Sequence, residues 1–142
     1  MDALCNLARI YAPLLGRILI SVLFLRSAVG KITGFSFVAA GMAKKGIPFA
    51  EFFLVGAIAC EVLGSLALIL GWKARWGALL LIIFMIPVTV LYHDFWNMEA
   101  AQYRNQLIHF MKNLTIFGAL VFILGMGSGP LSLERSKEPS GS

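Results

Sequence analysis

Charged residues are scarce in this sequence: Asp, Glu, Lys and Arg make up 13% of its 142 residues, about half of the usual share in a soluble domain. Hydrophobic residues make up 59% of the chain, and its mean hydropathy is +0.84. The composition therefore indicates that lipid is the solvent. The length allows one domain with about four spans of roughly 20 residues each.

Several functional motifs are also missing. The net charge is +5, but no basic block is interleaved with aromatic residues, so we expect no nucleic-acid binding. Cys5 and Cys60 lie far apart and form no CxxC pair, which argues against a disulfide or a thiol relay. The sequence contains no Walker loop, GxGxxG or GxSxG motif. Neither a flavin site nor a metal site is evident.

Four apolar segments are present, at about residues 11–31, 52–70, 77–92 and 107–126. The connections from the first to the second and from the third to the fourth mix aromatic and charged residues, as helices in a membrane interface do. We predict an all-α fold, an integral membrane four-helix bundle with amphipathic interfacial segments in these two connections. Residues 1–133 would form a single transmembrane domain, and residues 134–142 a disordered polar tail.

The number of spans predicts the topology. Four spans place both termini and the short turn GWKARWG on the same side of the membrane. That side holds Arg9, Lys73 and Arg75 and is slightly richer in uncompensated cations than the other. We therefore expect a multi-pass protein in contact with the lipid bilayer, with both termini in the cytoplasm.

Polar residues concentrate in the half of the membrane opposite the termini. A rise of about 1.5 Å per residue places Glu61 near mid-membrane. The residues predicted to share this half are Arg26, Lys31, Glu61, Tyr92, His93, His109 and Asn113. Charged groups at such depths are costly and turn inward to find partners. Small residues beside Glu61 allow another helix to approach, so its face should be buried in the bundle.

The buried glutamate has two interpretations. It could form a structural ion pair with Arg26 that fixes the helix register, or it could belong to a proton or ligand site. His93 and His109 could be ordinary interfacial histidines. Together with Glu61 they could hold a metal, but neither HxxxH nor ExxH spacing is present, so no metal site is predicted.

Several segments in order resemble the DoxX family of small four-span membrane proteins. They are LGRILISVLFLRSAVGK, GIP (46–48), CEVLGSLALILGWKARWGALLL, VLYHDFW and GSGPLSLE. The resemblance covers about residues 14–134 and implies a four-helix bundle in a bacterial-type inner membrane. Named family members are membrane subunits of an archaeal thiosulfate:quinone oxidoreductase. Two departures from the pattern are Arg26, where the family usually has an apolar residue, and Glu134 in place of Asp.

The resemblance leads to a functional hypothesis, the membrane subunit of a quinone-linked redox complex. Glu61 and His93 would be the catalytic proton donors, and Lys31, Asn113 and Arg26 would bind the quinone. The chain has no evident electron carrier, so a separate redox partner protein would supply electrons to this oxidoreductase subunit. One alternative is a non-catalytic scaffold that docks a partner at the membrane. Another is a small-solute transporter or channel, which would need a homodimer to enclose its pathway.

Overall fold

The computed structural model describes residues 1–134. Its elements in chain order are α1 (Asp2–Thr33), α2 (Phe35–Lys44), α3 (Ala50–Leu70), α4 (Ala74–Tyr92), the 3₁₀ turn η1 (Phe95–Asn97) and α5 (Ala100–Met126). No strand occurs in this part of the chain. The tail predicted from residue 134 onward lies outside the described residues, apart from Glu134 itself.

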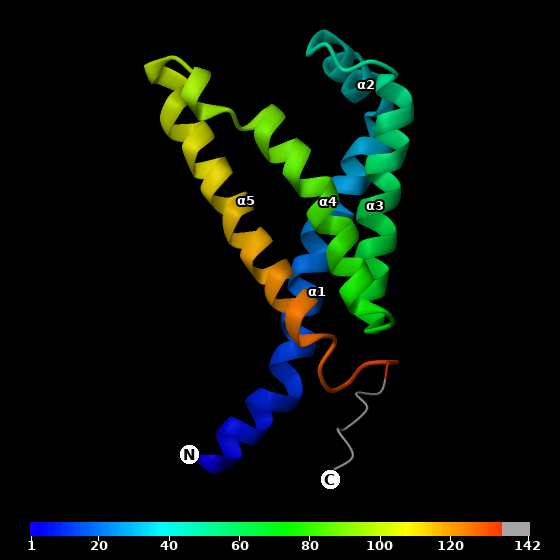
Figure 1. The fold of residues 1–142 in the computed structure, drawn as a ribbon, viewed down its shortest axis with the longest axis vertical. Helices are drawn as coiled ribbons and strands as arrows, with labels where there is room; N and C mark the ends of the chain where they lie inside the picture. The colour runs from blue at the N-terminus through cyan, green and yellow to red at the C-terminus, as the bar shows by residue number, and fades with distance from the viewer. Residues whose placement is uncertain (135–142) are drawn as a thin grey trace.

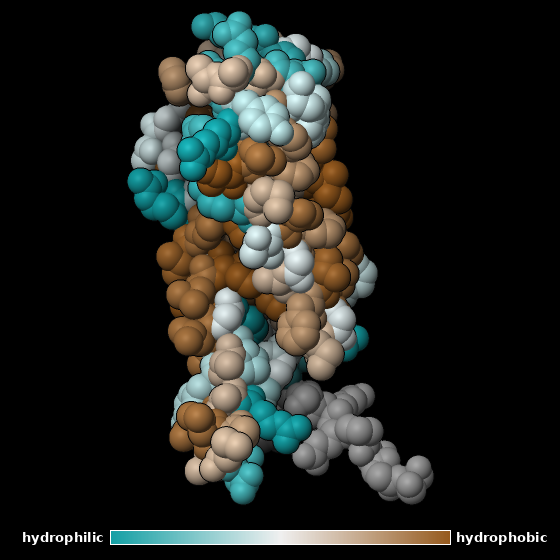
Figure 2. All heavy atoms as spheres, turned by 90° about the vertical axis from the view of Figure 1, so that its left-hand side faces the viewer, coloured by the Kyte–Doolittle hydropathy of each residue, from teal (hydrophilic) through white to brown (hydrophobic). Residues whose placement is uncertain are grey.

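Four helices within residues 1–134 are long and apolar enough to cross a membrane: α1, α3, α4 and α5. This confirms the predicted all-α fold with four spans. The short helix α2 lies in the first of the two long connections, and η1 lies in the second. Hydrophobic side chains occupy the middle of the face drawn in Figure 2, and hydrophilic ones gather toward its ends, which is the pattern expected of a protein that spans a bilayer.

The spanning helices are arranged as an open row. Helix α1 packs on α3, α3 packs on α4, and α4 packs on α5, while no extended contact joins α5 to α1. Figure 1 shows α5 diverging from α1 and α3 toward the end of the molecule that holds α2. Among the helices of residues 1–134, none therefore covers one flank of α5.

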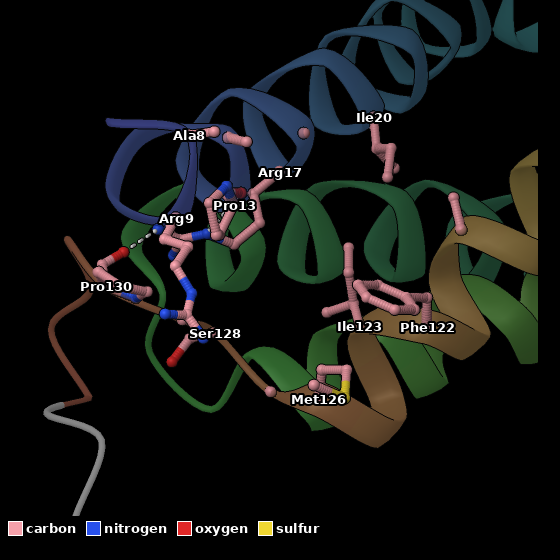
Figure 3. Close-up of a pocket in the computed structure, with 15 residues that line it drawn as sticks. Ala8, Arg9, Pro13, Arg17, Ile20, Phe122, Ile123, Met126, Ser128 and Pro130 are labelled. Carbon is pink, nitrogen blue, oxygen red and sulfur yellow. Dashed lines mark hydrogen bonds between the residues drawn. The ribbon is translucent and has the colours of Figure 1, made fainter. Parts of the chain in front are cut away.

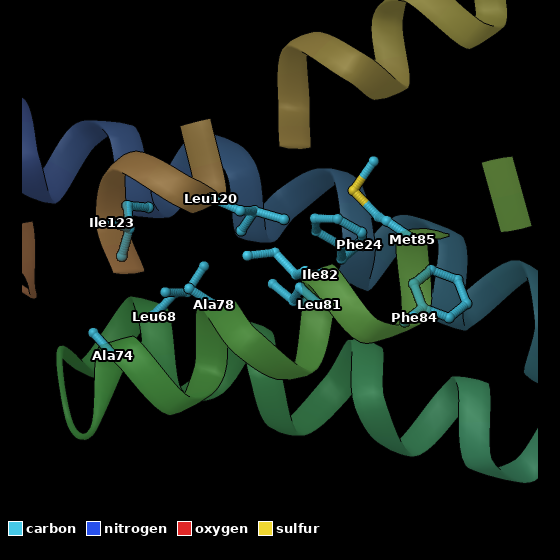
Figure 4. Close-up of a cluster of buried hydrophobic side chains, with 10 residues drawn as sticks. All are labelled: Phe24, Leu68, Ala74, Ala78, Leu81, Ile82, Phe84, Met85, Leu120 and Ile123. Atoms are coloured by element: carbon cyan, nitrogen blue, oxygen red, sulfur yellow. The ribbon is translucent and has the colours of Figure 1, made fainter. Parts of the chain in front are cut away.

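The apolar core lies around α4, one of the two helices in the interior of this row. Ten buried side chains form the core, and six come from α4 (Figure 4): Phe24, Leu68, Ala74, Ala78, Leu81, Ile82, Phe84, Met85, Leu120 and Ile123. Phe24 of α1 and Phe84 of α4 meet edge to face, with ring centroids 6.2 Å apart. Many other large apolar side chains are exposed, as expected where lipid replaces water.

Glycines allow α3 and α4 to approach closely. A Cβ atom on Gly64 would lie 2.7 Å from Leu81 Cγ and 3.0 Å from the carbonyl oxygen of Gly77. The prediction that small residues near Glu61 face another helix is thus confirmed for Gly64. Gly56, a small residue nearer the start of the same helix, is exposed instead, and a Cβ atom on it would meet nothing within 4 Å.

The turn between α3 and α4 depends on Gly71. This residue ends α3 in the left-handed conformation (φ 62°), which glycine adopts without the penalty that a side chain brings. The Trp72 N–H donates to the Ala67 carbonyl and the Gly71 N–H to that of Leu68, the pattern of a Schellman motif. A Cβ atom on Gly71 would clash with the Arg17 guanidinium and with Ser132, so the turn, α1 and the C-terminal segment meet at this point.

Candidate functional site

Glu61 forms a buried ion pair with Lys31. The Glu61 side chain, halfway along α3, is 0% exposed, and that of Lys31, near the end of α1, is 20% exposed. Lys31 Nζ lies 2.9 Å from Glu61 Oε1 and 3.1 Å from Oε2, and it also donates to Ser27 Oγ at 2.6 Å. All three ammonium protons therefore have acceptors, and both carboxylate oxygens are engaged.

The partner of Glu61 is Lys31 and not Arg26, and helix geometry explains why. The buried or half-buried stripe of α1 that faces the core is formed by Arg17, Ser21, Phe24, Ala28 and Lys31. Their alternating spacing of four and three residues keeps them on one face. Arg26 lies about 140° around the helix from Lys31, and it is exposed. The expected Arg26–Glu61 pair is thus corrected to Lys31–Glu61.

The remaining neighbour of the pair is aromatic. Lys31 Nζ lies 5.2 Å from the centroid of the Phe84 ring, which belongs to α4. A cation this close to an aromatic ring gains electrostatic stabilisation. The ion pair thus joins α1 to α3 and contacts α4. Because the Glu61 carboxylate is fully buried, a ligand could meet the partly exposed Lys31 ammonium without displacing the carboxylate.

The predicted residues His93 and Asn113 lie in a second polar group, between α4 and α5. His93 Nδ1 is 3.0 Å from Gln106 Oε1, and its ring stacks on that of His109 with centroids 5.2 Å apart. Asn113 Nδ2 donates to Thr89 Oγ1 at 3.0 Å. Within residues 1–134, none of these groups hydrogen-bonds to Lys31 or Glu61. The predicted site residues therefore form two clusters, with Arg26 outside both.

A small cavity adjoins the second group. It has a volume of about 180 Å³, is bordered by Asn113 and Thr89, and is otherwise lined by apolar residues of α4 and α5. Across residues 1–134, no group of three or more His, Cys, Asp or Glu side chains is placed to hold a metal ion.

Arg17 is a buried charged residue to which sequence reasoning assigned no role. Its side chain, on α1, is 1% exposed, and it donates to four backbone carbonyls: Pro13 at 3.3 Å, Leu68 at 3.1 Å, Pro130 at 3.5 Å and Leu131 at 2.8 Å. The C-terminal segment continues along the α3–α4 turn, where the N–H groups of Leu133 and Glu134 donate to the carbonyls of Leu70 and Gly71. A side chain with five donors in a fixed fork suits such a set of acceptors.

A large hollow lies at this same end, between α1 and the end of α5. This groove has a volume of about 810 Å³ and is mostly apolar. Figure 3 shows α1 along one side and the last turns of α5 along the other, with Ser128 and Pro130 at one end. Arg9 and Arg17 are the charged residues of its lining. None of the predicted site residues lies there.

Comparisons with known proteins agree with this architecture. The model of the DoxX family matches residues 12–94. The chain is similar to inner membrane protein YphA of Escherichia coli (strain K12), at 30% identity over 90% of this chain and 91% of that protein. It is also similar to inner membrane protein YqjF of the same organism, at 35% identity over 86% and 88%. No solved structure matches.

Proposed function

Because the chain belongs to the DoxX family and is a multi-pass membrane protein, we propose that it serves as the membrane subunit of a quinone-linked redox complex in the inner membrane. The observation that carries this proposal is the Lys31–Glu61 pair, a charged pair held inside a bundle whose outer surface is apolar. Ionisable groups inside a membrane protein are expensive and most often mark proton or ligand sites.

The residues around the pair suit a quinone head group. Lys31 offers an ammonium donor that is partly exposed, and a quinone carbonyl is an acceptor. Lys31 donates to the Glu61 carboxylate and to the neutral hydroxyl of Ser27. A quinone carbonyl could replace the Ser27 hydroxyl as acceptor and leave the ion pair intact. Phe84 supplies an aromatic surface next to the ammonium.

A quinone supplies two-electron chemistry coupled to the uptake of two protons. Lys31 and Glu61 can hold and exchange protons at this point of the bundle, in the manner of general acid–base groups. The electrons would come from a partner protein that carries a flavin or a haem. His93 and Asn113 lie between α4 and α5, so their role in this proposal is to line a route near the α4–α5 cavity and not to share one binding site with Lys31.

The test is to purify the protein from its native membrane in mild detergent and to quantify the extracted quinone per chain. We expect close to one quinone in the wild type and a loss in Glu61→Gln. The matched control is Glu51→Gln, which changes an exposed carboxylate on the same helix. Wild-type protein with no more quinone than its bulk lipid would overturn the proposal, whatever the variants do.

A second candidate function is a non-catalytic scaffold. The complete burial of Glu61 and the full use of the Lys31 protons favour it, because a satisfied ion pair can serve to fix helix register alone. In that case Glu61→Gln would fail to assemble, and the wild type would carry no quinone. The same purification therefore distinguishes the two candidates.

A further inference from the structure

The groove between α1 and α5 has the form of a lipid site. Its walls are α1 from Ala8 to Ile20 and α5 from Ala119 to Met126, and its end near Arg9 is closed by residues 127–130. Small residues of α1 (Ala12 and Gly16) form one wall, and a Cβ atom on Gly16 would meet nothing within 4 Å. The apolar surface is therefore open, and no helix within residues 1–134 fills it.

The length of the groove indicates which kind of molecule occupies it. From Ala8 to Ile20 the rise of α1 is about 18 Å. The hydrocarbon core of a bilayer is about 30 Å thick, so the groove covers little more than one leaflet. A spanning helix of a second copy would need a surface about 30 Å deep, whereas a lipid extends through one leaflet only.

Charge indicates the head group. Arg9 lines the groove at its interfacial end and is exposed. The exposed cations Lys73 and Arg75 lie at the same end of the bundle, on the α3–α4 turn and the start of α4. Within residues 1–134, the one salt bridge is Lys31–Glu61, and the acids at the Arg9 end are Asp2 and Glu134. Clustered Arg and Lys beside a spanning helix attract anionic head groups.

From these observations we infer that the groove binds an anionic glycerophospholipid. Its phosphate lies at Arg9, and an acyl chain lies along Ala12, Gly16 and Ile20 of α1, opposite Phe122 and Ile123 of α5. Arg17 contributes to the wall of the groove, but its donors are already used by backbone carbonyls. On the topology predicted from the sequence, this lipid belongs to the cytoplasmic leaflet. The site is separate from the Lys31–Glu61 pair.

The experiment uses native mass spectrometry of the full chain, purified in a mild detergent and titrated with phosphatidylglycerol or with phosphatidylcholine. We expect the wild type to retain one phosphatidylglycerol in preference to phosphatidylcholine. Arg9→Gln should weaken phosphatidylglycerol binding roughly fivefold, as expected for one basic contact to an anionic head group. Arg104→Gln changes an exposed cation at the opposite end and should leave the preference intact.

A second pair of variants tests the apolar part. Gly16→Leu fills the groove and should abolish retention of the lipid. Gly118→Leu is its control, since Gly118 is exposed on α5, outside the groove, and its Cβ also meets nothing within 4 Å. Equal retention of the two lipids by the wild type, or equal retention of phosphatidylglycerol by these two variants, would overturn the proposal.

Two other occupants would give different results. If Gly16→Leu converted a dimer to a monomer without changing the bound lipid, the groove would belong to a second copy of the chain. If it removed a quinone and no phospholipid, the groove would hold a quinone tail. Either result would overturn the phospholipid assignment. If the wild type carries no quinone, the phospholipid assignment is unaffected, because the quinone proposal rests on Lys31 and Glu61.

Discussion

Arg17 on the first helix donates a 2.8 Å hydrogen bond to the carbonyl oxygen of Leu131, 114 residues further along the chain. The same guanidinium reaches the last turn of α3 through Leu68. One buried side chain thus links α1, the end of α3 and the C-terminal segment.

Arg17→Leu is expected to destabilise the protein severely. Each buried carbonyl left without a donor costs about 1–3 kcal/mol. The Leu68 carbonyl would keep the Gly71 N–H, but those of Pro130 and Leu131 would lose the donor that Arg17 supplies. Thermal unfolding in detergent should show a large fall in Tm or no folded protein at all. Arg26→Leu, an exposed arginine on the same helix, should stay within about 0.5 kcal/mol of the wild type. Similar melting of the two variants would show that the four hydrogen bonds contribute little.

The Lys31–Glu61 pair is expected to behave as a coupled unit. Removing one partner leaves the other charge buried and unpaired, at a cost of about 3–5 kcal/mol. We expect Lys31→Met and Glu61→Gln each to lower Tm, and the double variant to melt at a higher temperature than either single variant. If the Tm of the double variant falls by the sum of the decreases in the two single variants, Lys31 and Glu61 are not coupled. If the quinone proposal is correct, the double variant should regain stability but carry no bound quinone.

Close packing of α3 on α4 predicts a contrast between two glycines. Gly64→Ala places a Cβ against Leu81 and the Gly77 carbonyl, and such overpacking costs about 1–3 kcal/mol. Gly56→Ala, on the same helix but in open space, should leave the stability unchanged or raise it by up to about 1 kcal/mol, because alanine favours the helix. Thermal unfolding of both variants measures the difference, and equal effects would contradict the close crossing.

The hydrogen bond between Asn113 and Thr89 predicts a small coupling between α4 and α5. Interhelical hydrogen bonds in membrane proteins contribute about 0.6 kcal/mol on average and up to about 1.7 kcal/mol. A double-mutant cycle of Asn113→Leu and Thr89→Val should give a coupling energy in this range. The control cycle combines Thr89→Val with Thr115→Val, because Thr115 donates to Met111 of its own helix. If the control cycle gives an equally large coupling energy, the coupling between Asn113 and Thr89 cannot be assigned to their hydrogen bond.

The fold was largely predictable from the sequence, because four long apolar runs leave few other structures in lipid. Burial of Glu61 also followed, since a mid-membrane carboxylate must turn inward. The partner of Glu61 was predicted wrongly, because the depth of each residue in the membrane was considered and its position around the helix was not. Lys31 shares a helix face with Phe24 and Arg17, whereas Arg26 does not, and this periodicity is visible in the sequence.

Other features required coordinates. The link from Arg17 to Leu131 is non-local, and nothing in the spacing of GSGPLSLE indicates that its carbonyls face a residue of the first span. The division of Glu61, His93 and Asn113 into two clusters depends on how far α5 leans away from α1 (Figure 1), which hydropathy does not determine.

The bonds of Arg17 also impose an order on biosynthesis. The first span enters the bilayer while its arginine has only the Pro13 carbonyl of its own helix as an acceptor. Its other acceptors, Leu68, Pro130 and Leu131, emerge from the ribosome later. Nascent chains that stop before Gly127 should therefore stay sensitive to protease at the α3–α4 turn, and chains extended past Leu131 should become resistant. The hydrogen bonds of the first helix are thus completed by residues that are made 113 and 114 positions later.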